Sequence, residues 1–220
     1  MVLQIMKRIS IVSIISLFLI ISLFNSPIVA ESKYKAEWQE LIKNNQKIIK
    51  KNDEKEDKKE DKNIKAHFRL GVAYANLGKI DRAKKEFDLL SDLNDGQTAK
   101  SIIKYYEARL EKNPDNAMFL NYLGFANYAS HNYKVSLKLF KKIIKNDPKN
   151  IWSYNYLGTI YGKLEKYDQA EKVLQKSLEL EENRYTHFLL GAVYYKQGRI
   201  FKALYHIGQS GKVATKLLEW

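Results

Sequence analysis

The sequence contains no cysteine among its 220 residues. Disulfides, cysteine-based zinc sites, thiol catalysis, c-type haem attachment and a lipid anchor on an N-terminal cysteine are therefore excluded. Proline is scarce, with three residues, and the ten glycines are too few for a β-fold that needs many tight turns. Lysine, leucine, glutamate and alanine favour helix. The composition therefore argues against an all-β fold and favours helix, although the many tyrosines and isoleucines alone would not.

Arginine is also scarce, because it supplies only six of the 38 basic side chains. The formal net charge of +13 therefore comes mostly from lysine. Arginine reads base edges with a planar fork of donors, whereas lysine is a hydrated point charge. The charge argues against specific nucleic-acid binding and favours a lysine-rich surface that keeps the protein soluble.

Motifs that carry catalysis are missing as well. The sequence has no HExxH, no GxSxG and no phosphate loop, and its histidines stand singly at His67, His131, His187 and His206. We therefore expect no catalytic residues, no cofactor and no metal site, and a protein that is not an enzyme.

The N-terminus has the layout of a secretory signal peptide. Lys7 and Arg8 precede an uncharged run from Ile9 to Phe24, and a small residue, Ala30, follows a break at residues 25–27. Cleavage after Ala30 is the first prediction, although an uncleaved membrane anchor stays open because a spanning helix needs about 20 apolar residues. In both cases we expect an extracytoplasmic protein: secreted, periplasmic or held at the outer face of the cytoplasmic membrane.

Residues 31–63 read as a helix followed by a charged spacer. Apolar residues at helical spacing predict an amphipathic helix from about Lys35 to Lys50, namely Tyr34, Trp38, Leu41, Ile42, Ile48 and Ile49. Residues 50–63 contain no apolar side chain, which predicts a solvated spacer because there is nothing to bury.

Residues 64–220 repeat one short motif. Leu-Gly occurs four times, with its glycines at 71, 124, 158 and 191, which are 53, 34 and 33 residues apart. Each Leu-Gly lies inside a helical apolar pattern, where glycine costs about 1 kcal/mol relative to alanine. A cost repeated four times predicts a repeated compensation, and we expect the close approach of a second helix at each glycine. A period in the thirties indicates stacked helix pairs.

At this point the sequence resembles the tetratricopeptide repeat family. Residues 151–183 match its pattern through Tyr154, Leu157, Gly158, Tyr161, Ala170 and Leu174, and weaker matches cover 64–97, 117–150 and 184–217. The resemblance implies a right-handed superhelical array of antiparallel helix pairs, a solenoid. It also implies a non-enzymatic scaffold for contacts between proteins.

Two departures from the family pattern bear on the shape of the array. An extra helix is inserted over residues 98–113, which predicts a kink or split there. At the other end, Gly208 and Gly211 interrupt the last helix, and the chain continues to Leu217, Leu218 and Trp220. This apolar tail either caps the array or forms an edge for self-association, and the Trp38 helix is a further candidate to cover an array end.

The resemblance places the first helix of each pair on the concave face, where a segment of a partner protein would bind. The expected partner-binding residues there are Met118, Asn121, Phe125, Tyr128, Trp152, Asn155, Thr159, Lys163, Tyr185, Phe188 and Tyr195. Asn121 and Asn155 would grip a peptide backbone with their amides, and the aromatic residues would supply apolar contact.

Two alternatives stay open beside this peptide groove. The chain could be a self-associating structural subunit of an envelope complex. It could also bind a polyanion, such as a cell-wall polymer or lipid headgroups, through a stripe on the convex side: Lys134, Lys138, Lys141, Lys142 and Lys145. The family's carboxylate clamp is not assembled, because Phe125, Thr159 and Ala192 stand where its polar residues would be.

Overall fold

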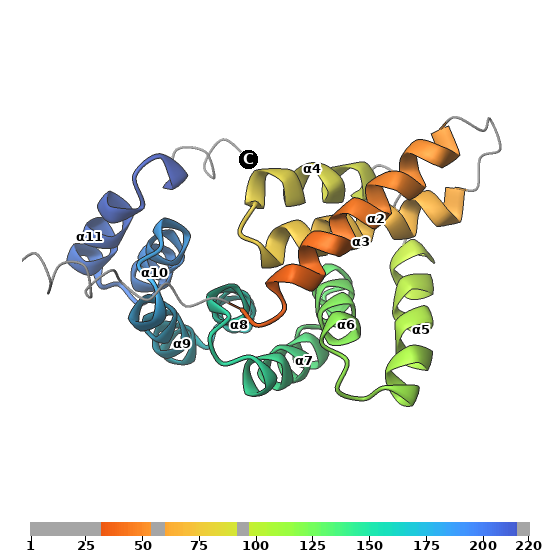
Figure 1. Ribbon diagram of the computed structural model, residues 1–220. Helices are drawn as coiled ribbons and strands as arrows, with labels where there is room; N and C mark the ends of the chain where they lie inside the picture. Colours follow the sequence, from red (N-terminus) through yellow and green to blue (C-terminus); the bar gives the residue numbers. More distant parts are fainter. Residues whose placement is uncertain (1–31, 54–59, 92–96, 215–220) are drawn as a thin grey trace, which may run out of the picture.

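The computed structural model describes residues 32–53, 60–91 and 97–214, and every regular element in these ranges is an α-helix. The helices are α2 (Lys35–Asp53), α3 (Glu60–Asn76), α4 (Ile80–Ser91), α5 (Gln97–Lys112), α6 (Ala117–Ala129), α7 (Tyr133–Asn146), α8 (Ile151–Lys163), α9 (Tyr167–Leu180), α10 (Arg184–Lys196) and α11 (Ile200–Ser210). Four helix pairs form, α3–α4, α6–α7, α8–α9 and α10–α11, and the last three stack on one another along a curved path (Figure 1). The predicted all-α array of helix pairs is confirmed.

Each pair closes over the glycine of its Leu-Gly motif. A β-carbon placed on any of these glycines would lie 2.6–2.8 Å from an apolar side chain of the second helix. The facing residues are Gly71 with Phe87, Gly124 with Phe140, Gly158 with Leu174, and Gly191 with Ile207. Since real β-carbon contacts are longer than this, the expected close approach of a second helix is confirmed at all four positions.

The turns inside the pairs also follow one design. A residue with positive φ stands seven positions after each of these glycines: Gly78, His131, Glu165 and Gly198, with φ of 68°, 60°, 57° and 73°. The left-handed conformation ends the first helix and turns the chain back for the second. Glycine adopts it freely, whereas His131 and Glu165 adopt it at a cost.

Asparagine side chains start the first helices of the three later pairs. Asn116, Asn150 and Asn183 each accept hydrogen bonds from backbone N–H groups of the first turn that follows. These groups have no partner inside a helix, so the caps fix where α6, α8 and α10 begin.

The inserted helix α5 changes the direction of the array. It packs on α6, and α3 then contacts both α6 and α8. The Tyr156 hydroxyl of α8 donates a 2.7 Å hydrogen bond to the Ala75 carbonyl of α3. The turn at Gly78 lies against the Trp152 ring, which a β-carbon there would approach to 2.2 Å. The first pair therefore lies across the hollow of the later pairs (Figure 1).

Helix α2 belongs to the same packed structure. Trp38 is fully buried, and its ring meets Tyr122 edge-on at 6.3 Å within a cluster that includes Phe68 and Tyr106. The amphipathic helix expected over 35–50 therefore forms, and it covers α3 at the start of the array.

The charged stretch at 50–63 differs in part from the predicted spacer. Its first and last residues are helical, because α2 runs to Asp53 and α3 begins at Glu60. The Asn52 amide donates a 2.6 Å hydrogen bond to the Asn63 side chain and ties the two helices together. The expected signal or anchor (1–30) and the apolar tail residues Leu217, Leu218 and Trp220 lie outside the described residues. Among the described helices, none combines the length and the apolar character that a membrane crossing requires.

Candidate functional site

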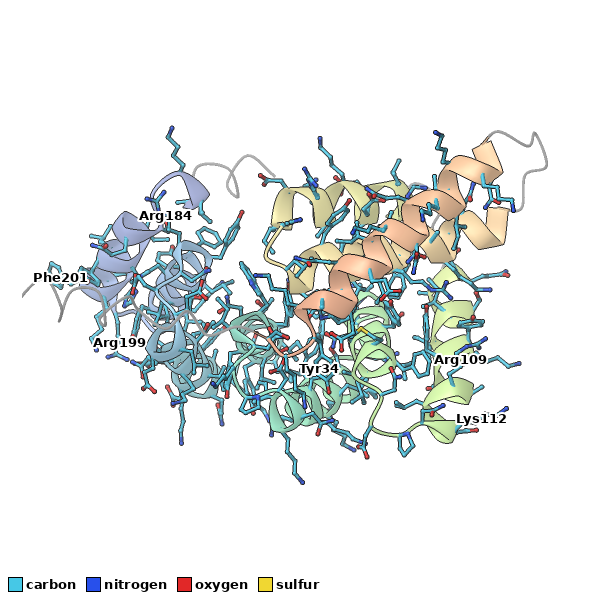
Figure 2. All side chains as sticks on the ribbon, viewed as in Figure 1. Tyr34, Arg109, Lys112, Arg184, Arg199 and Phe201 are labelled. Atoms are coloured by element: carbon cyan, nitrogen blue, oxygen red, sulfur yellow. The ribbon has the colours of Figure 1, made fainter. Side chains whose placement is uncertain are left out.

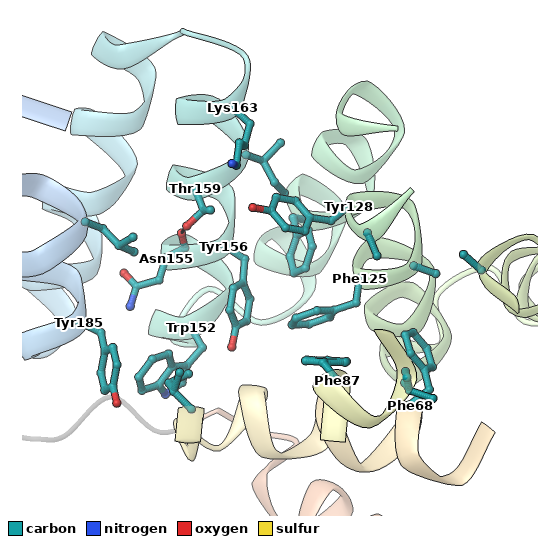
Figure 3. A pocket seen from close by; sticks show the side chains of 18 of the residues that line it. Phe68, Phe87, Phe125, Tyr128, Trp152, Asn155, Tyr156, Thr159, Lys163 and Tyr185 are labelled. Carbon is teal, nitrogen blue, oxygen red and sulfur yellow. Dashed lines mark hydrogen bonds between the residues drawn. The ribbon is translucent and has the colours of Figure 1, made fainter. Parts of the chain in front are cut away.

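A pocket of about 870 Å³ lies between the first pair and the first helices of the later pairs. We call it the central pocket. Helices α4 and α5 form one side with Ile80, Phe87, Leu90, Thr98, Ala99 and Ile102. Helices α6, α8 and α10 form the other, and Figure 3 shows their side chains pointing into the space between. The pocket exists because the first pair lies across the concave face.

Nine of the 21 residues that line the pocket are aromatic, and several of their rings are in contact. Phe125 stacks on Phe87 at 5.9 Å and meets Tyr156 edge-on at 4.8 Å. Trp152 meets Tyr185 edge-on at 5.7 Å at the end of the pocket near the Gly78 turn. Rings that support one another are held rigid, so they can take up an apolar ligand at a small entropic cost.

The Tyr156 hydroxyl already has a partner, the Ala75 carbonyl. Burial raises the pKa of this phenol above its ordinary value, so it stays neutral and keeps its hydrogen bond at physiological pH. Tyr156 therefore presents its ring face to the pocket and fixes α8 against α3.

Asn155 brings a polar group to this apolar wall. Its side chain is 2% exposed, and its Oδ1 accepts a 2.9 Å hydrogen bond from the Thr186 hydroxyl of α10. Its Nδ2 is buried and has no hydrogen-bond partner in the described part of the chain. Figure 3 shows the amide between Thr159 and Tyr185 on the pocket wall. A buried donor without a partner costs about 1–3 kcal/mol.

The polar residues Thr159 and Lys163 complete the α8 side of the pocket. The Thr159 hydroxyl donates a 3.0 Å hydrogen bond to the backbone carbonyl of Asn155 in the same helix. Thr159 also lines the pocket. Lys163, one turn further, is an exposed residue that also lines the pocket beside Tyr128, so it sets a positive charge at the pocket's edge.

Most of the residues expected on the concave face come together here. Those that line the central pocket are Phe125, Tyr128, Trp152, Asn155, Thr159, Lys163, Tyr185 and Phe188. They come from three helices, α6, α8 and α10, in the register that the repeat pattern implies.

Three expected residues do not line the pocket. Met118 packs against the cluster around Trp38. Tyr195 is 65% exposed beyond the pocket, at the end of α10. Asn121 is 2% exposed, and its Nδ2 donates a 2.9 Å hydrogen bond to the Ala117 carbonyl. Asn121 and Asn155 therefore differ, although they occupy the same place in consecutive repeats.

Several pocket residues carry no functional signal in the sequence. Phe87 fits the repeat pattern as a packing residue opposite Gly71, yet it also faces the pocket. Leu90 and Ile102 line it because α5 folds the first pair back, a consequence of long-range packing. Tyr156 does carry a signal that the sequence analysis missed, since a large aromatic residue one position before Leu-Gly recurs as Tyr122 in the preceding repeat.

The lysine stripe lies on the far side of the second pair. Four of its lysines are exposed: Lys134, Lys138, Lys141 and Lys145. The fifth, Lys142, donates a 2.7 Å hydrogen bond to the Pro114 carbonyl and forms a 3.0 Å ion pair with Asp115. Contact of this stripe with a polyanion stays a prediction.

The structure brings two of the four histidines together. His187 and His206 face each other with their Nδ1 atoms 2.7 Å apart, and the His187 Nε2 contacts the Glu182 carboxylate. Partial burial, followed by the neighbouring His187, lowers the pKa of His206. Within the described residues no group of three or more histidine and acidic side chains is arranged to hold a metal ion.

Comparisons with family models and with curated proteins point to the same family. Three tetratricopeptide repeat models match, at residues 64–96, 103–151 and 139–172. The chain is similar to human tetratricopeptide repeat protein 21B, with 29% identity over 146 residues that cover 61% of this chain. The match spans only 11% of the human protein.

Among solved structures, a crystal structure of MamA protein is 17% identical, with a TM-score of 0.54, and the match covers 83% of this chain and 96% of that one. A second MamA crystal structure is 15% identical with a TM-score of 0.48, and its match covers 86% of this chain and 95% of that one. At these identities the likeness concerns the fold alone. The in-phase Leu-Gly motifs, the helix pairs that close over them and the three model matches agree, and this chain is a tetratricopeptide repeat protein.

Proposed function

We propose that this protein is a non-enzymatic interaction module that holds an apolar segment of a partner protein in the central pocket. The observation that carries the proposal is the pocket itself, a space of about 870 Å³ with aromatic walls and one buried donor, Asn155 Nδ2, that has no partner among the described residues. A cavity of this size and character is typical of a ligand site.

The wall chemistry indicates what the segment looks like. Rings and aliphatic side chains suit two or three large apolar residues of the partner. Asn155 Nδ2 can donate to a backbone carbonyl of the segment, which its buried position makes favourable. Lys163 at the edge favours an acidic residue next to the apolar ones. We therefore propose a short apolar segment flanked by Asp or Glu.

Peptide display tests this proposal, because the method selects ligands from random sequences and needs no identified partner. Random peptides are selected on residues 31–220 of the chain, and their Kd is measured by calorimetry. We expect apolar peptides with an acidic flank. Thr159→Arg places a long charged side chain in the pocket and should weaken binding about tenfold or more.

The matched control is Lys138→Glu, on the exposed face of α7. It changes the charge of the molecule but leaves the pocket intact, so the affinity should stay the same. If Lys138→Glu abolished binding while Thr159→Arg had no effect, the central pocket would not be the site.

We also propose that the chain is exported, because Lys7, Arg8, the apolar run and Ala30 follow the layout of a signal peptide. N-terminal sequencing of the protein from its native cell checks this. A mature chain that begins at Glu31 supports cleavage, and an intact chain in the membrane fraction supports an anchor. An intact chain in the cytoplasm would contradict export.

A further inference from the structure

Cations gather around one tyrosine of the inserted helix α5. The Lys65 ammonium and the guanidinium groups of Arg69 and Arg109 lie 4.7, 5.9 and 3.4 Å from the centroid of the Tyr105 ring. Together with Tyr106 we call these residues the Tyr105 cluster, and Figure 2 shows Arg109 on α5 at the edge of the molecule. None of the five is among the residues that line the central pocket. Three of them belong to α5, so the repeat pattern alone does not produce the cluster.

The two phenol groups of the cluster accept hydrogen bonds but find no acceptor for their own protons. Arg69 donates from Nε to the Tyr106 hydroxyl at 2.7 Å and from a terminal nitrogen to the Tyr105 hydroxyl at 3.3 Å. In the described part of the chain no acceptor lies within hydrogen-bonding distance of either O–H proton, although Tyr106 is only 1% exposed. Buried donors in proteins are nearly always paired, so the cluster lacks an acceptor.

The cluster also lacks a counter-charge. Neither of its half-buried arginines has a carboxylate partner among the described residues, whereas Arg199 pairs with Glu171 at 2.7 Å. The acidic residues of α5, Glu107 and Glu111, stand two positions from Arg109 and therefore face away from it. Like charges held close together repel one another, so an anion placed between them would be bound favourably.

We propose that the Tyr105 cluster binds a phosphate group, as a second ligand site apart from the central pocket. A phosphate monoester carries a charge of about −1.5 to −2 at pH 7 and three acceptor oxygens. It can therefore accept hydrogen bonds from both arginines, from the Tyr105 hydroxyl and from Lys65, and it offsets much of their positive charge. A phosphate group thus supplies both the acceptor and the counter-charge that the described residues do not provide.

The position of Arg109 leaves donors for such a ligand. Its guanidinium lies over the Tyr105 ring and donates one hydrogen bond, of 3.1 Å, to the Tyr105 backbone carbonyl. The other N–H groups along its edge have no partner in the described part of the chain. Because the donors of the cluster come from several side chains on two helices, they suit a group with oxygens in several directions. A carboxylate has two oxygens in one plane and pairs best with a single arginine fork.

Calorimetric titration of residues 31–220 with inorganic phosphate, in a chloride buffer of low ionic strength, tests the proposal. We expect saturable binding. Arg109→Gln should weaken it about tenfold or more, because one charged fork is lost. Arg69→Lys keeps the charge but loses the planar fork, so it should weaken binding as well. The matched control is Arg82→Gln, because Arg82 also lies over a tyrosine ring, that of Tyr74 at 5.8 Å, but outside the cluster. The control should keep the affinity of the wild type, and circular dichroism checks the helix content of each variant.

Side-chain NMR of the arginines gives a second measurement that needs no loss of a cluster residue. Phosphate should shift the Nε–H signals of Arg69 and Arg109 and leave that of Arg199, which already has a carboxylate partner, unchanged. Tighter binding of glycerol 3-phosphate than of inorganic phosphate would assign the cluster to a phosphate ester, and the reverse order to the free ion. Three results would overturn the proposal: no saturable binding of phosphate, a loss of affinity in Arg82→Gln as large as that in Arg109→Gln, or acetate binding as tightly as phosphate.

Discussion

Gly158 lies on the face of α8 that meets α9, where a β-carbon would come within 2.6 Å of the Leu174 side chain. Leu174 is fully buried, so it has no free space into which to retreat. Gly162 lies one turn further along the same helix, and a β-carbon there would meet nothing within 4 Å. Substitutions at the two glycines therefore distinguish two effects on stability within one helix: close packing at Gly158 and helix propensity alone at Gly162.

Alanine at the two positions should therefore change stability in opposite directions. Gly158→Ala should lower the free energy of unfolding by about 1–3 kcal/mol, because it overpacks the pair. Gly162→Ala should raise it by about 1 kcal/mol through helix propensity. Urea unfolding followed by circular dichroism measures both. Equal stabilisation by the two substitutions would mean that Leu174 does not restrict the space at Gly158.

Glu165 stands at a turn position with φ of 57°, which glycine occupies in two of the other pairs. Glu165→Gly should raise the free energy of unfolding by about 1 kcal/mol, because it relieves the strain of the left-handed conformation. Glu165→Ala is the control and should bring no such gain, since alanine keeps a β-carbon. A gain with alanine as large as that with glycine would rule out backbone strain as the cause.

The contact between His187 and His206 makes the last pair sensitive to pH. The pKa of His206 is lowered by partial burial and then by His187, with Lys202 acting in the same direction and Glu182 and Glu171 opposing it. The folded state therefore favours the neutral ring. The unfolded chain takes up a proton near its ordinary pKa of about 6.5, so stability present at higher pH is lost as the pH falls through that value.

His206→Gln should reduce this loss between pH 7.5 and pH 5.5, because the group whose pKa is depressed is gone. The measurement is the free energy of unfolding at both values, with His131→Gln, at an exposed turn, as the control. The same pH dependence in all three proteins would show that His206 does not contribute to it.

At the scale of elements, α2 ties the N-terminal part of the described chain into the array. Trp38 is buried with Tyr122, Phe68 and Tyr106, residues of α6, α3 and α5. A helix that places its tryptophan among three others is a structural part of the fold rather than a separate tether. It occupies the side of α3 that would otherwise be the open start of the array.

Trp38→Ala should lower the free energy of unfolding by about 3–5 kcal/mol, because it leaves a large cavity. Ile48→Ala, on the same helix but 37% exposed, should change it by only about 0.5 kcal/mol. Guanidinium unfolding compares the two variants with the wild type. If both had the same small effect, α2 would not be part of the core.

The elements themselves could be predicted from local pattern. Leu-Gly inside a helical apolar pattern marked every first helix, because packing forces the same residue at the same place each time. The resemblance to the tetratricopeptide repeat family implied the second helix of each pair. The course of the first pair could not be predicted. It depends on how α5 directs the chain, and on the contacts of Tyr156 with Ala75 and of Gly78 with Trp152, which are 81 and 74 positions apart in the sequence.

At the scale of the whole molecule, the bend at α5 converts an open concave face into the central pocket. The resemblance to the tetratricopeptide repeat family placed Trp152, Thr159 and Tyr185 on this face. It gave Asn121 and Asn155 the same role, and here it failed, because Asn121 is buried beside its own helix carbonyl while Asn155 reaches the pocket wall. Whether an asparagine at this repeat position reaches the pocket depends on the packing of neighbouring repeats, so the local sequence pattern cannot predict it.

Hydrogen exchange with and without a peptide selected on residues 31–220 is the most direct test of the central pocket as a binding site. We expect slower amide exchange in α8, around Asn155 and Thr159, and in α4, around Phe87, because the ligand would contact both sides of the pocket. Slower exchange confined to the lysines of α7, with α4 and α8 unchanged, would contradict the account and place the ligand on the convex face.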